Sequence, residues 1–134
     1  MDLDRLFKEA EKAALQSYSP YSHFRVGAAL LTEDGKIFTG ANVENRSFGL
    51  TICAERSAVV SAVSSGEKRF IALAISTPDS ETPVGPCGAC RQVLSEFMSG
   101  DAPVRFGGSS GEKVNTTIAD LLPFDSLYEL AETL

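Results

Sequence analysis

The chain has 134 residues, of which 43% are hydrophobic and 22% are charged, and its formal net charge is −6. This composition is ordinary for a soluble globular protein, and the length is typical of one domain with its own core, predicted here over residues 1–134. The excess of 18 acidic residues over 12 lysines and arginines opposes the basic surface of a nucleic-acid-binding protein. We therefore expect no nucleic acid among its partners.

Two features of the sequence favour a cytoplasmic protein without a membrane partner. The first residues, Met1 to Arg5, lack the pattern of a signal peptide, and no apolar run is long enough to span a bilayer. In the reducing cytoplasm, cysteines more often bind metal or take part in chemistry than form disulfides. An odd total of three cysteines also fits a disulfide scaffold poorly.

The pattern of apolar residues predicts helices and strands in chain order. Spacings of three and four residues indicate helices, alternation or short apolar runs indicate strands, and Asp34-Gly35 is a typical hairpin turn. Asp2 is the expected N-cap of the first helix. The expected elements are a helix at 4–17, strands at 24–32 and 36–42, a helix from 54 to near Gly66, a strand at 70–76, a helix from 87 to near Gly100, strands at 104–106 and 114–118, and a short helix at 126–132.

Helices that alternate with strands in the middle of the chain call for an α/β layer arrangement. The strand at 70–76 is nearly all apolar, which is typical of a central strand covered on both faces. This strand and the hairpin are expected to deliver the chain to the same end of the sheet. A cysteine begins the helix that follows each of them, so the two helix starts are expected to lie side by side.

All three cysteines lie between Thr51 and Phe97, at spacings typical of metal ligands. Cys87 and Cys90, at the start of a predicted helix, place two sulfur atoms about one turn apart on the same side. Cys53 begins the other helix, and helix N-termini favour thiolate over thiol. Three thiolates fill three positions of a tetrahedral zinc ion and leave the fourth open for water, which is the catalytic pattern.

Three further residues have expected roles at this zinc ion. Glu55, two residues after Cys53, could accept a proton from zinc-activated water and pass it to a substrate nitrogen. Arg56, one turn after Cys53, could offset part of the negative charge of the thiolates. Gln92 could donate a hydrogen bond that orients a ligand sulfur.

Two other interpretations of the cysteines have less support. A closed structural zinc site needs a fourth ligand, but there is no fourth cysteine, and the only histidine, His23, lies in a polar turn and is expected at the surface. Cysteines can also serve as small buried hydrophobic residues. The Cys-x-x-Cys pair after Pro86, together with a third cysteine followed by Ala-Glu-Arg, argues against that interpretation.

These motifs resemble the small, homotetrameric class of zinc-dependent cytidine deaminases, within the cytidine and deoxycytidylate deaminase superfamily. Cys-Ala-Glu at 53–55 and Pro-Cys-Gly-Ala-Cys at 86–90 match the zinc signature of nucleobase deaminases. Pro-Tyr-Ser-His-Phe-Arg-Val-Gly-Ala-Ala-Leu at 20–30 is similar to the family's Pro-Tyr-Ser-x-Phe-x-Val-Gly-Ala-Ala stretch, and Gly-Ala-Asn-Val-Glu-Asn at 40–45 to its nucleoside-binding stretch. The resemblance covers nearly the whole chain.

The resemblance implies a fold, a cofactor and an assembly. The fold would be an α/β protein, a three-layer α/β/α sandwich around a five-stranded mixed sheet. One Zn²⁺ per chain would be bound by Cys53, Cys87 and Cys90, with Glu55 as the proton shuttle. The protein would be a homotetramer in which neighbouring subunits complete each site.

The resemblance also implies how a small nucleoside would be bound. Phe24 would pack against the pyrimidine ring, and the backbone of Ala54 would contact the base. Asn42 and Glu44 would hydrogen-bond the ribose 3′-hydroxyl. Phe48 stands where the family commonly has tyrosine, which removes one hydroxyl, and it is not included in the expected site.

One departure from the family pattern concerns the C-terminal region. The family often has two residues between Leu-Leu-Pro and a phenylalanine that reaches a neighbouring subunit's site, whereas here Phe124 directly follows Pro123. Phe124 is therefore also left out of the expected site.

The implied activity is hydrolytic deamination of cytidine and deoxycytidine to uridine and deoxyuridine plus ammonia, a step of pyrimidine salvage. The nearest rival is a deaminase of a cytosine-containing antibiotic such as blasticidin S, which shares Pro-Cys-Gly-x-Cys-Arg-Gln; Phe24 and the Asn42-x-Glu44 stretch favour the nucleoside. A polynucleotide-editing deaminase is opposed by the net charge and by cysteine rather than histidine at position 53. A zinc-stabilised interaction module, the remaining rival, would not need Glu55.

Overall fold

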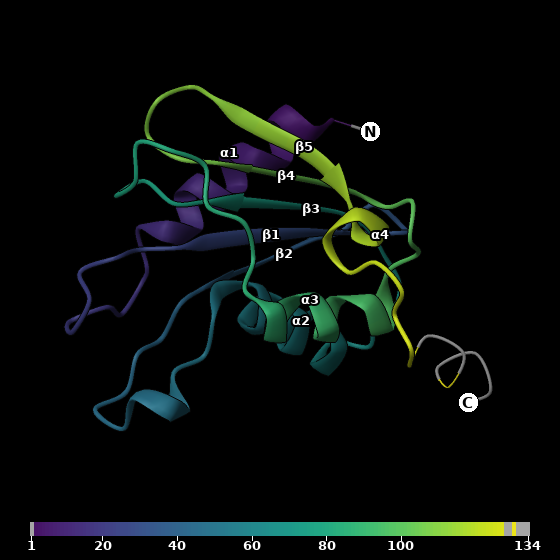
Figure 1. Cartoon of the computed structure of the whole chain (residues 1–134), viewed down its shortest axis with the longest axis horizontal. Coiled ribbons are helices and arrows are strands. Elements are labelled where there is room, and N and C mark those ends of the chain that lie inside the picture. Colours follow the sequence, from purple (N-terminus) through teal and green to yellow (C-terminus); the bar gives the residue numbers. More distant parts are fainter. Residues whose placement is uncertain (1, 128–129, 131–134) are drawn as a thin grey trace.

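A computed structural model describes residues 2–127 and 130 of the chain. The strands are β1 (Gly27–Thr32), β2 (Ile37–Ala41), β3 (Phe70–Ser76), β4 (Pro103–Gly107) and β5 (Lys113–Thr117). They form one sheet in the order β2-β1-β3-β4-β5 (Figure 1). Because β3 pairs parallel with β4 while the other pairs are antiparallel, the sheet is mixed, as expected.

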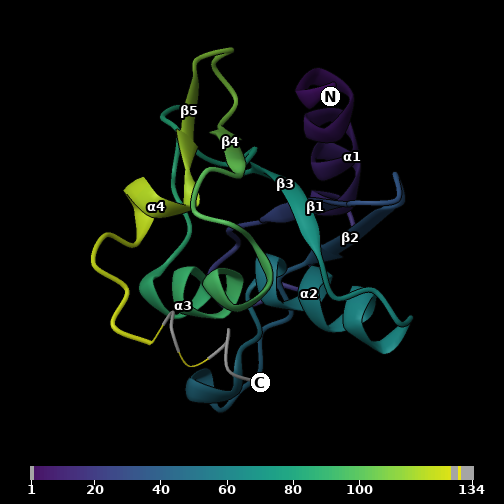
Figure 2. The ribbon, with the colours of Figure 1, turned by 90° about the vertical axis from the view of Figure 1, so that its right-hand side faces the viewer.

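Helices cover both faces of this sheet. α1 (Leu3–Ala14) lies on one face, and α2 (Ala54–Ser64) and α3 (Gly88–Phe97) lie next to each other on the opposite face (Figures 1 and 2). A 3-10 helix, η1 (Phe48–Leu50), lies in the loop before α2, and a short helix, α4 (Ile118–Leu121), follows β5 directly. The predicted three-layer α/β/α sandwich with a five-stranded sheet is confirmed.

Alternate side chains of the central strands belong to two separate cores. Successive residues of a strand point to opposite faces, so a strand that is apolar throughout is covered on both sides. The core under α2 and α3 includes Ala28, Leu30, Leu73 and Ile75, and the core under α1 includes Ala29, Ala72, Ala74, Leu6, Phe7 and Ala10. The buried strand residues of the core under α1 are alanines, which lets this helix pack close to the sheet, and Leu31 and Ile37 pack at its edge.

The ends of several elements differ from the prediction. The first helix has the expected N-cap, since the Asp2 side chain accepts a hydrogen bond from the Arg5 N–H. It ends at Ala14 rather than at residue 17. The first strand begins at Gly27 rather than at residue 24, because side chains from distant loops, and not a partner strand, bind the backbone N–H groups of residues 25 and 26 and the carbonyl of residue 24.

The region after β5 was predicted wrongly at one point. The strand expected at 114–118 ends at Thr117, whose hydroxyl accepts a hydrogen bond from the Asp120 N–H and so caps α4, a helix that the sequence pattern did not indicate. The helix expected at 126–132 falls largely outside the described residues. Within the described part of the chain, no helix has the length and apolar character needed to cross a membrane.

Gly40 of β2 allows α2 to pack directly against the sheet. A Cβ atom at position 40 would lie 2.4 Å from the Ala58 nitrogen and 2.6 Å from the Ala54 carbonyl oxygen, both backbone atoms of α2. The same helix begins at Cys53 and contains Glu55 in its first turn. A side chain at position 40 would therefore push α2, and the residues at its start, away from the sheet.

We expect Gly40→Ala to lower the free energy of unfolding by about 2–3 kcal/mol, because a close-packed contact has no room for the added methyl group. Gly49→Ala is the matched control, since a Cβ atom at position 49 would meet no atom within 4 Å. Chemical denaturation of both variants measures the difference. Equal free energies of unfolding would contradict the close approach of α2 to β2.

Candidate metal centre and adjoining pocket

Cys53 and Cys87 occupy equivalent positions at the starts of two neighbouring helices. Each is the N-cap residue and has an extended backbone, with φ −70° at Cys53 and φ −68° at Cys87. Cys90 lies in the first turn of α3 and is buried. The Sγ atoms of Cys53 and Cys87 are 3.8 Å apart, and those of Cys87 and Cys90 are 3.4 Å apart. The expected side-by-side arrangement of the two helix starts is confirmed.

The three sulfur atoms fit one tetrahedral zinc ion. All three lie within 4.8 Å of one another. Zinc–sulfur bonds of about 2.3 Å at tetrahedral angles require sulfur atoms that are roughly 3.8 Å apart, which is close to the spacings observed. Among the described residues, no fourth cysteine, histidine or carboxylate joins the group, and His23 is exposed, as expected. One coordination position thus remains that no described side chain fills.

Arg56 places a positive charge beside the cysteines. Its Nη2 donates to the Cys53 Sγ at 3.2 Å. Hydrogen bonds from Cys90 and Arg56 lower the pKa of the Cys53 thiol to about 5, so this sulfur is a thiolate at neutral pH. The interaction with the Cys53 thiolate raises the pKa of Cys90. The donor set therefore already holds a thiolate, the form of cysteine that binds metal.

The hydrogen bond expected from Gln92 to a ligand sulfur is not among the contacts of the described residues. Gln92 is exposed on α3, and its backbone carbonyl accepts a hydrogen bond from Ser95 Oγ at 2.8 Å.

Glu55 is a carboxylic acid buried beside the cysteines. It lies in the first turn of α2 with only 4% of its surface exposed, and it lines the same pocket as Cys53 and Cys87. Burial raises the pKa of Glu55 to about 7, because the protein interior disfavours the charged form. A carboxyl group with such a pKa can both accept and donate a proton near neutral pH, as general acid–base catalysis requires.

A pocket of about 180 Å³ opens next to the cysteines. Three of the four residues expected to bind substrate, Phe24, Asn42 and Ala54, line this pocket together with Glu55. The remaining non-cysteine lining residues are Val26, Thr51, Ile75, Thr77, Val84 and Gly85. Two of the three clustered cysteines, a buried acid and an aromatic ring therefore meet in one cavity, although they come from three separate stretches of the chain.

Asn42 is buried and supports the wall of this pocket. Its Oδ1 accepts from the Val26 N–H at 2.9 Å, and its Nδ2 donates to the Phe24 carbonyl oxygen at 2.8 Å. Ser17 Oγ donates to the same Oδ1. An amide nitrogen has two hydrogens, so one remains for a ligand.

Glu44 is the one expected substrate-binding residue that does not line the pocket. Its carboxylate accepts from the Tyr21 N–H at 3.0 Å, from the Ser22 N–H at 3.2 Å and from Ser22 Oγ. The hydrogen bond from Ser22 Oγ contributes most to lowering the pKa of Glu44. In this arrangement Glu44 stabilises the turn that leads to Phe24.

The loop between β3 and α3 also forms part of the pocket, which was not predicted from the sequence. Besides Cys87, the loop residues Thr77, Val84 and Gly85 line the pocket. Arg91 folds back from α3, so that its Nε donates to the Pro86 carbonyl oxygen at 2.8 Å. The Arg91 Nη1 also donates to the Leu121 carbonyl oxygen at 3.0 Å, at the end of α4. The three prolines of the loop and the arginine directly after Cys90 are the signals that could have indicated a restrained segment.

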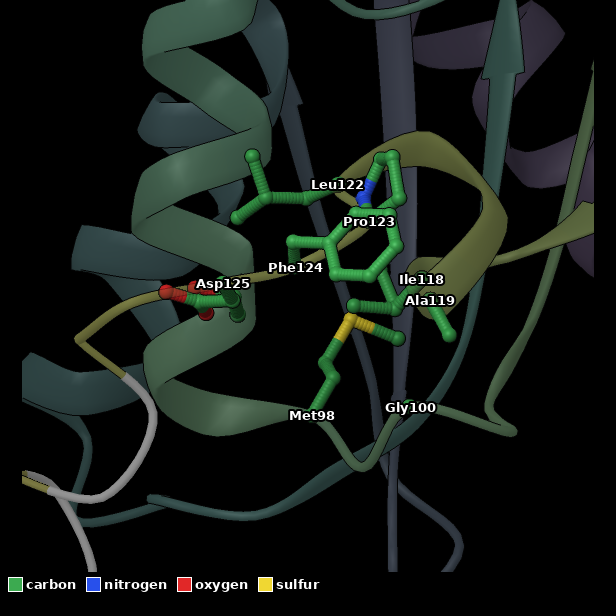
Figure 3. Close-up of a pocket in the computed structure, with 9 residues that line it drawn as sticks. Met98, Gly100, Ile118, Ala119, Leu122, Pro123, Phe124 and Asp125 are labelled. Atoms are coloured by element: carbon green, nitrogen blue, oxygen red, sulfur yellow. The ribbon is translucent and has the colours of Figure 1, made fainter.

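A larger hollow, of about 330 Å³, lies away from the cysteines, between α3 and the segment that follows α4 (Figure 3). Met98, Ile118 and Leu122 contribute apolar side chains to it, and Phe124 lies at its edge with its side chain fully exposed. Among the described residues of this lining, Asp125 is the only ionisable one. Phe124 thus lies outside the cysteine pocket of its own chain.

A known protein family has a zinc-binding region that matches the part of the chain with the three cysteines and Glu55. Residues 1–105 match the model of the family described as the cytidine and deoxycytidylate deaminase zinc-binding region. The chain belongs to the cytidine and deoxycytidylate deaminase family. The matched range contains all three cysteines and Glu55, so the metal for which this deaminase site is built is zinc.

Individual members of the deaminase family agree with this assignment. The chain is 52% identical over 123 residues to a cytidine deaminase of Sporosarcina psychrophila, which covers 92% of this chain and 90% of that protein. The crystal structure of a cytidine deaminase from Burkholderia pseudomallei matches with a TM-score of 0.88 and 44% identity, covering 92% of this chain and 98% of that one. A blasticidin-S deaminase of Bacillus cereus is 35% identical over 131 residues, covering 91% of this chain and 89% of that protein.

Proposed function

We propose that this protein is a zinc-dependent hydrolase that deaminates cytidine and deoxycytidine to uridine and deoxyuridine, with release of ammonia, as a step of pyrimidine salvage. The observation that carries the proposal is a single pocket. It is lined by Cys53 and Cys87 of the three-cysteine group, by the buried side chain of Glu55 and by Phe24. The 52% identity to a protein named cytidine deaminase supports the same substrate.

Three cysteines would hold one Zn²⁺ per chain. The ligands would be the sulfur atoms of Cys53, Cys87 and Cys90. A zinc ion bound there supplies Lewis acidity and lowers the pKa of water to about 7. Arg56 would offset part of the negative charge of the thiolates through its hydrogen bond to Cys53.

Glu55 would move the protons of the reaction. Hydrolytic deamination forms a bond between a water oxygen and C4 of the cytosine ring, and it breaks the bond between C4 and the exocyclic nitrogen. Glu55 would accept one proton from the attacking water and donate it to ring N3. It would then transfer the second proton of that water to the leaving amine, which departs as ammonia.

The walls of the pocket would bind the nucleoside. The Phe24 ring would pack against the pyrimidine, and the Ala54 backbone would contact the base. The remaining Nδ2 hydrogen of Asn42 would reach the ribose 3′-hydroxyl. Glu44 would accept a hydrogen bond from the same 3′-hydroxyl, in place of one of the hydrogen bonds that it now accepts from the turn at Tyr21 and Ser22.

The small pocket and the apolar surface near it support a homotetramer in which neighbouring subunits complete each site. The pocket volume of about 180 Å³ is below the roughly 300–1,000 Å³ of usual small-molecule sites. Phe48 and Leu50 of η1 are 71% and 67% exposed, and exposed apolar patches commonly mark protein–protein contacts. The reduced thiols of the cysteine group suit a cytoplasmic protein.

A deamination assay compares the proposed substrate, cytidine, with the rival substrate, blasticidin S. Blasticidin S is the second candidate because the chain is 35% identical to a blasticidin-S deaminase. We expect the purified protein to contain about one zinc ion per chain and to convert cytidine to uridine. Three cysteines fill three positions of a tetrahedral zinc ion, and the fourth position stays open for water. Absorbance of the base follows the reaction with each compound alone and in competition. Turnover of the antibiotic without turnover of cytidine would reject the substrate, and turnover by metal-free protein would reject zinc.

A further inference from the structure

Asp79, in the loop after β3, connects this loop to the segment before β1 through three hydrogen bonds. Its Oδ2 accepts from the Arg25 backbone N–H at 2.8 Å and from Arg25 Nε at 3.0 Å, and its Oδ1 accepts from Arg25 Nη2 at 2.8 Å. Paired N–H groups on a carboxylate form the stronger kind of ion pair. Hydrogen bonds from Arg25 lower the pKa of Asp79 to about 2, so the carboxylate is charged at neutral pH.

One peptide group is held from both sides by this contact and by Asn42. The N–H that Asp79 binds belongs to the peptide between Phe24 and Arg25, and the carbonyl of the same peptide accepts from Asn42 Nδ2 at 2.8 Å. Phe24 and Val26, on either side of Arg25, both line the pocket. The position of the Phe24 ring therefore depends on two side chains that lie far from it in the sequence.

Asp79 also restrains the loop after β3, which forms another part of the pocket wall. The lining residues of this loop are Thr77, Val84 and Gly85, which lie on both sides of Asp79 in the sequence. The loop is attached elsewhere at Thr77, whose N–H donates to the Gly107 carbonyl oxygen at 3.0 Å, and at Ser80, whose carbonyl oxygen accepts from the Ser109 N–H at 2.7 Å. It is also attached at Pro86, which is held by Arg91. Of these attachments, the one at Asp79 reaches the Phe24 segment.

We propose that Asp79 is a positioning residue for nucleoside binding, which holds the Phe24 segment and the loop at 77–86 at the separation that the pyrimidine ring requires. The inference rests on the proposed function. Asp79 makes no contact with substrate and transfers no proton. Its loss affects binding more than the chemical step, because Glu55 and the cysteines are held by α2 and α3.

Variants of Asp79 and Arg25 separate the backbone hydrogen bond from the ion pair. Asp79→Ala removes all three hydrogen bonds, and we expect it to raise KM for cytidine about tenfold, the equivalent of one hydrogen bond to a charged group, with kcat and zinc content nearly unchanged. Arg25→Ala keeps the bond from the backbone N–H, so we expect it to raise KM only about twofold to threefold. Asp79→Asn keeps an acceptor for that N–H and is expected to fall between the two.

Glu67→Ala is the matched control, because it breaks an ion pair with Lys36 of 3.0 Å whose residues do not line the pocket. We expect this variant to leave KM unchanged. A melting temperature that falls in Asp79→Ala while KM stays at the wild-type value would overturn the proposal, because Asp79 would then serve stability alone. A fall in kcat accompanied by loss of zinc would overturn it as well. If Asp79→Ala does not fold, KM is compared between Asp79→Asn and Arg25→Ala. A larger rise in KM for Asp79→Asn than for Arg25→Ala supports the proposal, and a wild-type KM in Asp79→Asn overturns it.

Hydrogen–deuterium exchange at the Arg25 amide gives a readout that does not depend on turnover. We expect exchange at this amide to be faster in Asp79→Ala than in the wild type, and little changed in Arg25→Ala, in which the backbone bond persists. Equal exchange in all three proteins would overturn the proposal. If the wild-type protein binds zinc but does not convert cytidine, the proposed function fails, and the amide exchange still decides whether Asp79 fixes this wall of the pocket.

Discussion

Glu55→Gln is expected to lower kcat for cytidine by about 10³–10⁴-fold, the upper end of what general acid–base catalysis contributes, because one carboxyl group handles more than one proton transfer. The amide has nearly the shape of the carboxyl group but cannot accept and release protons. The cysteine group is untouched, so zinc should remain at about one ion per chain. Absorbance assays and metal analysis of the same preparation measure both quantities.

The matched control for this variant is Glu96→Gln, which makes the same substitution at an exposed position of α3. We expect the control to keep the wild-type kcat. Substantial turnover by Glu55→Gln would contradict the proton-transfer role of Glu55. A protein that loses no measurable property on this substitution would instead fit a zinc-stabilised interaction module.

Cys87→Ala is expected to abolish both zinc binding and turnover. Zinc bound by thiolate sites has a binding free energy of about 10–16 kcal/mol spread over few ligands, so the loss of one sulfur weakens binding by several orders of magnitude. Because Cys87 is exposed, the substitution creates no cavity in the core, and the chain should still fold. Metal analysis after dialysis against a chelator, together with thermal unfolding, measures the effect.

Gly88→Ala tests whether any change at the start of α3 would have the same result. A Cβ atom at position 88 would meet no atom within 4 Å, so this neighbour of Cys87 should tolerate the methyl group and keep zinc and activity. If Cys87→Ala retained a full equivalent of zinc through dialysis, the three cysteines could not be the metal site.

Sequence analysis predicted the elements best where a residue's own chemistry sets the nearby backbone. Asp2 caps α1, Gly35 turns the hairpin with φ 90°, and Gly66 follows α2 with φ 95°. The prediction failed where distant groups decide. Residues 24–26 have the alternating pattern of a strand, but side chains from two loops bind their backbone, and β1 begins only at Gly27.

The candidate site divides in the same way. The cysteines and Glu55 were found from two short motifs, because within each motif the residues lie at the N-cap or in the first turn of a helix, where spacing along the chain sets spacing in space. The roles expected for Glu44 and Gln92 depend on where a long side chain points, and the local sequence does not fix this direction. Glu44 is held by the turn at Tyr21 and Ser22, and Gln92 is exposed.

The sequence by itself therefore determined the α/β class, through the order of helix and strand patterns along the chain, and the short motifs that contain the three cysteines and Glu55. Only the tertiary structure decided how these pieces meet. The 3.8 Å between the sulfur atoms of Cys53 and Cys87 requires α2 and α3 to dock on one face of the sheet. Asp79 reaches Arg25 across 54 residues because β1 and β3 are paired neighbours, and no local pattern can specify a contact that depends on that pairing.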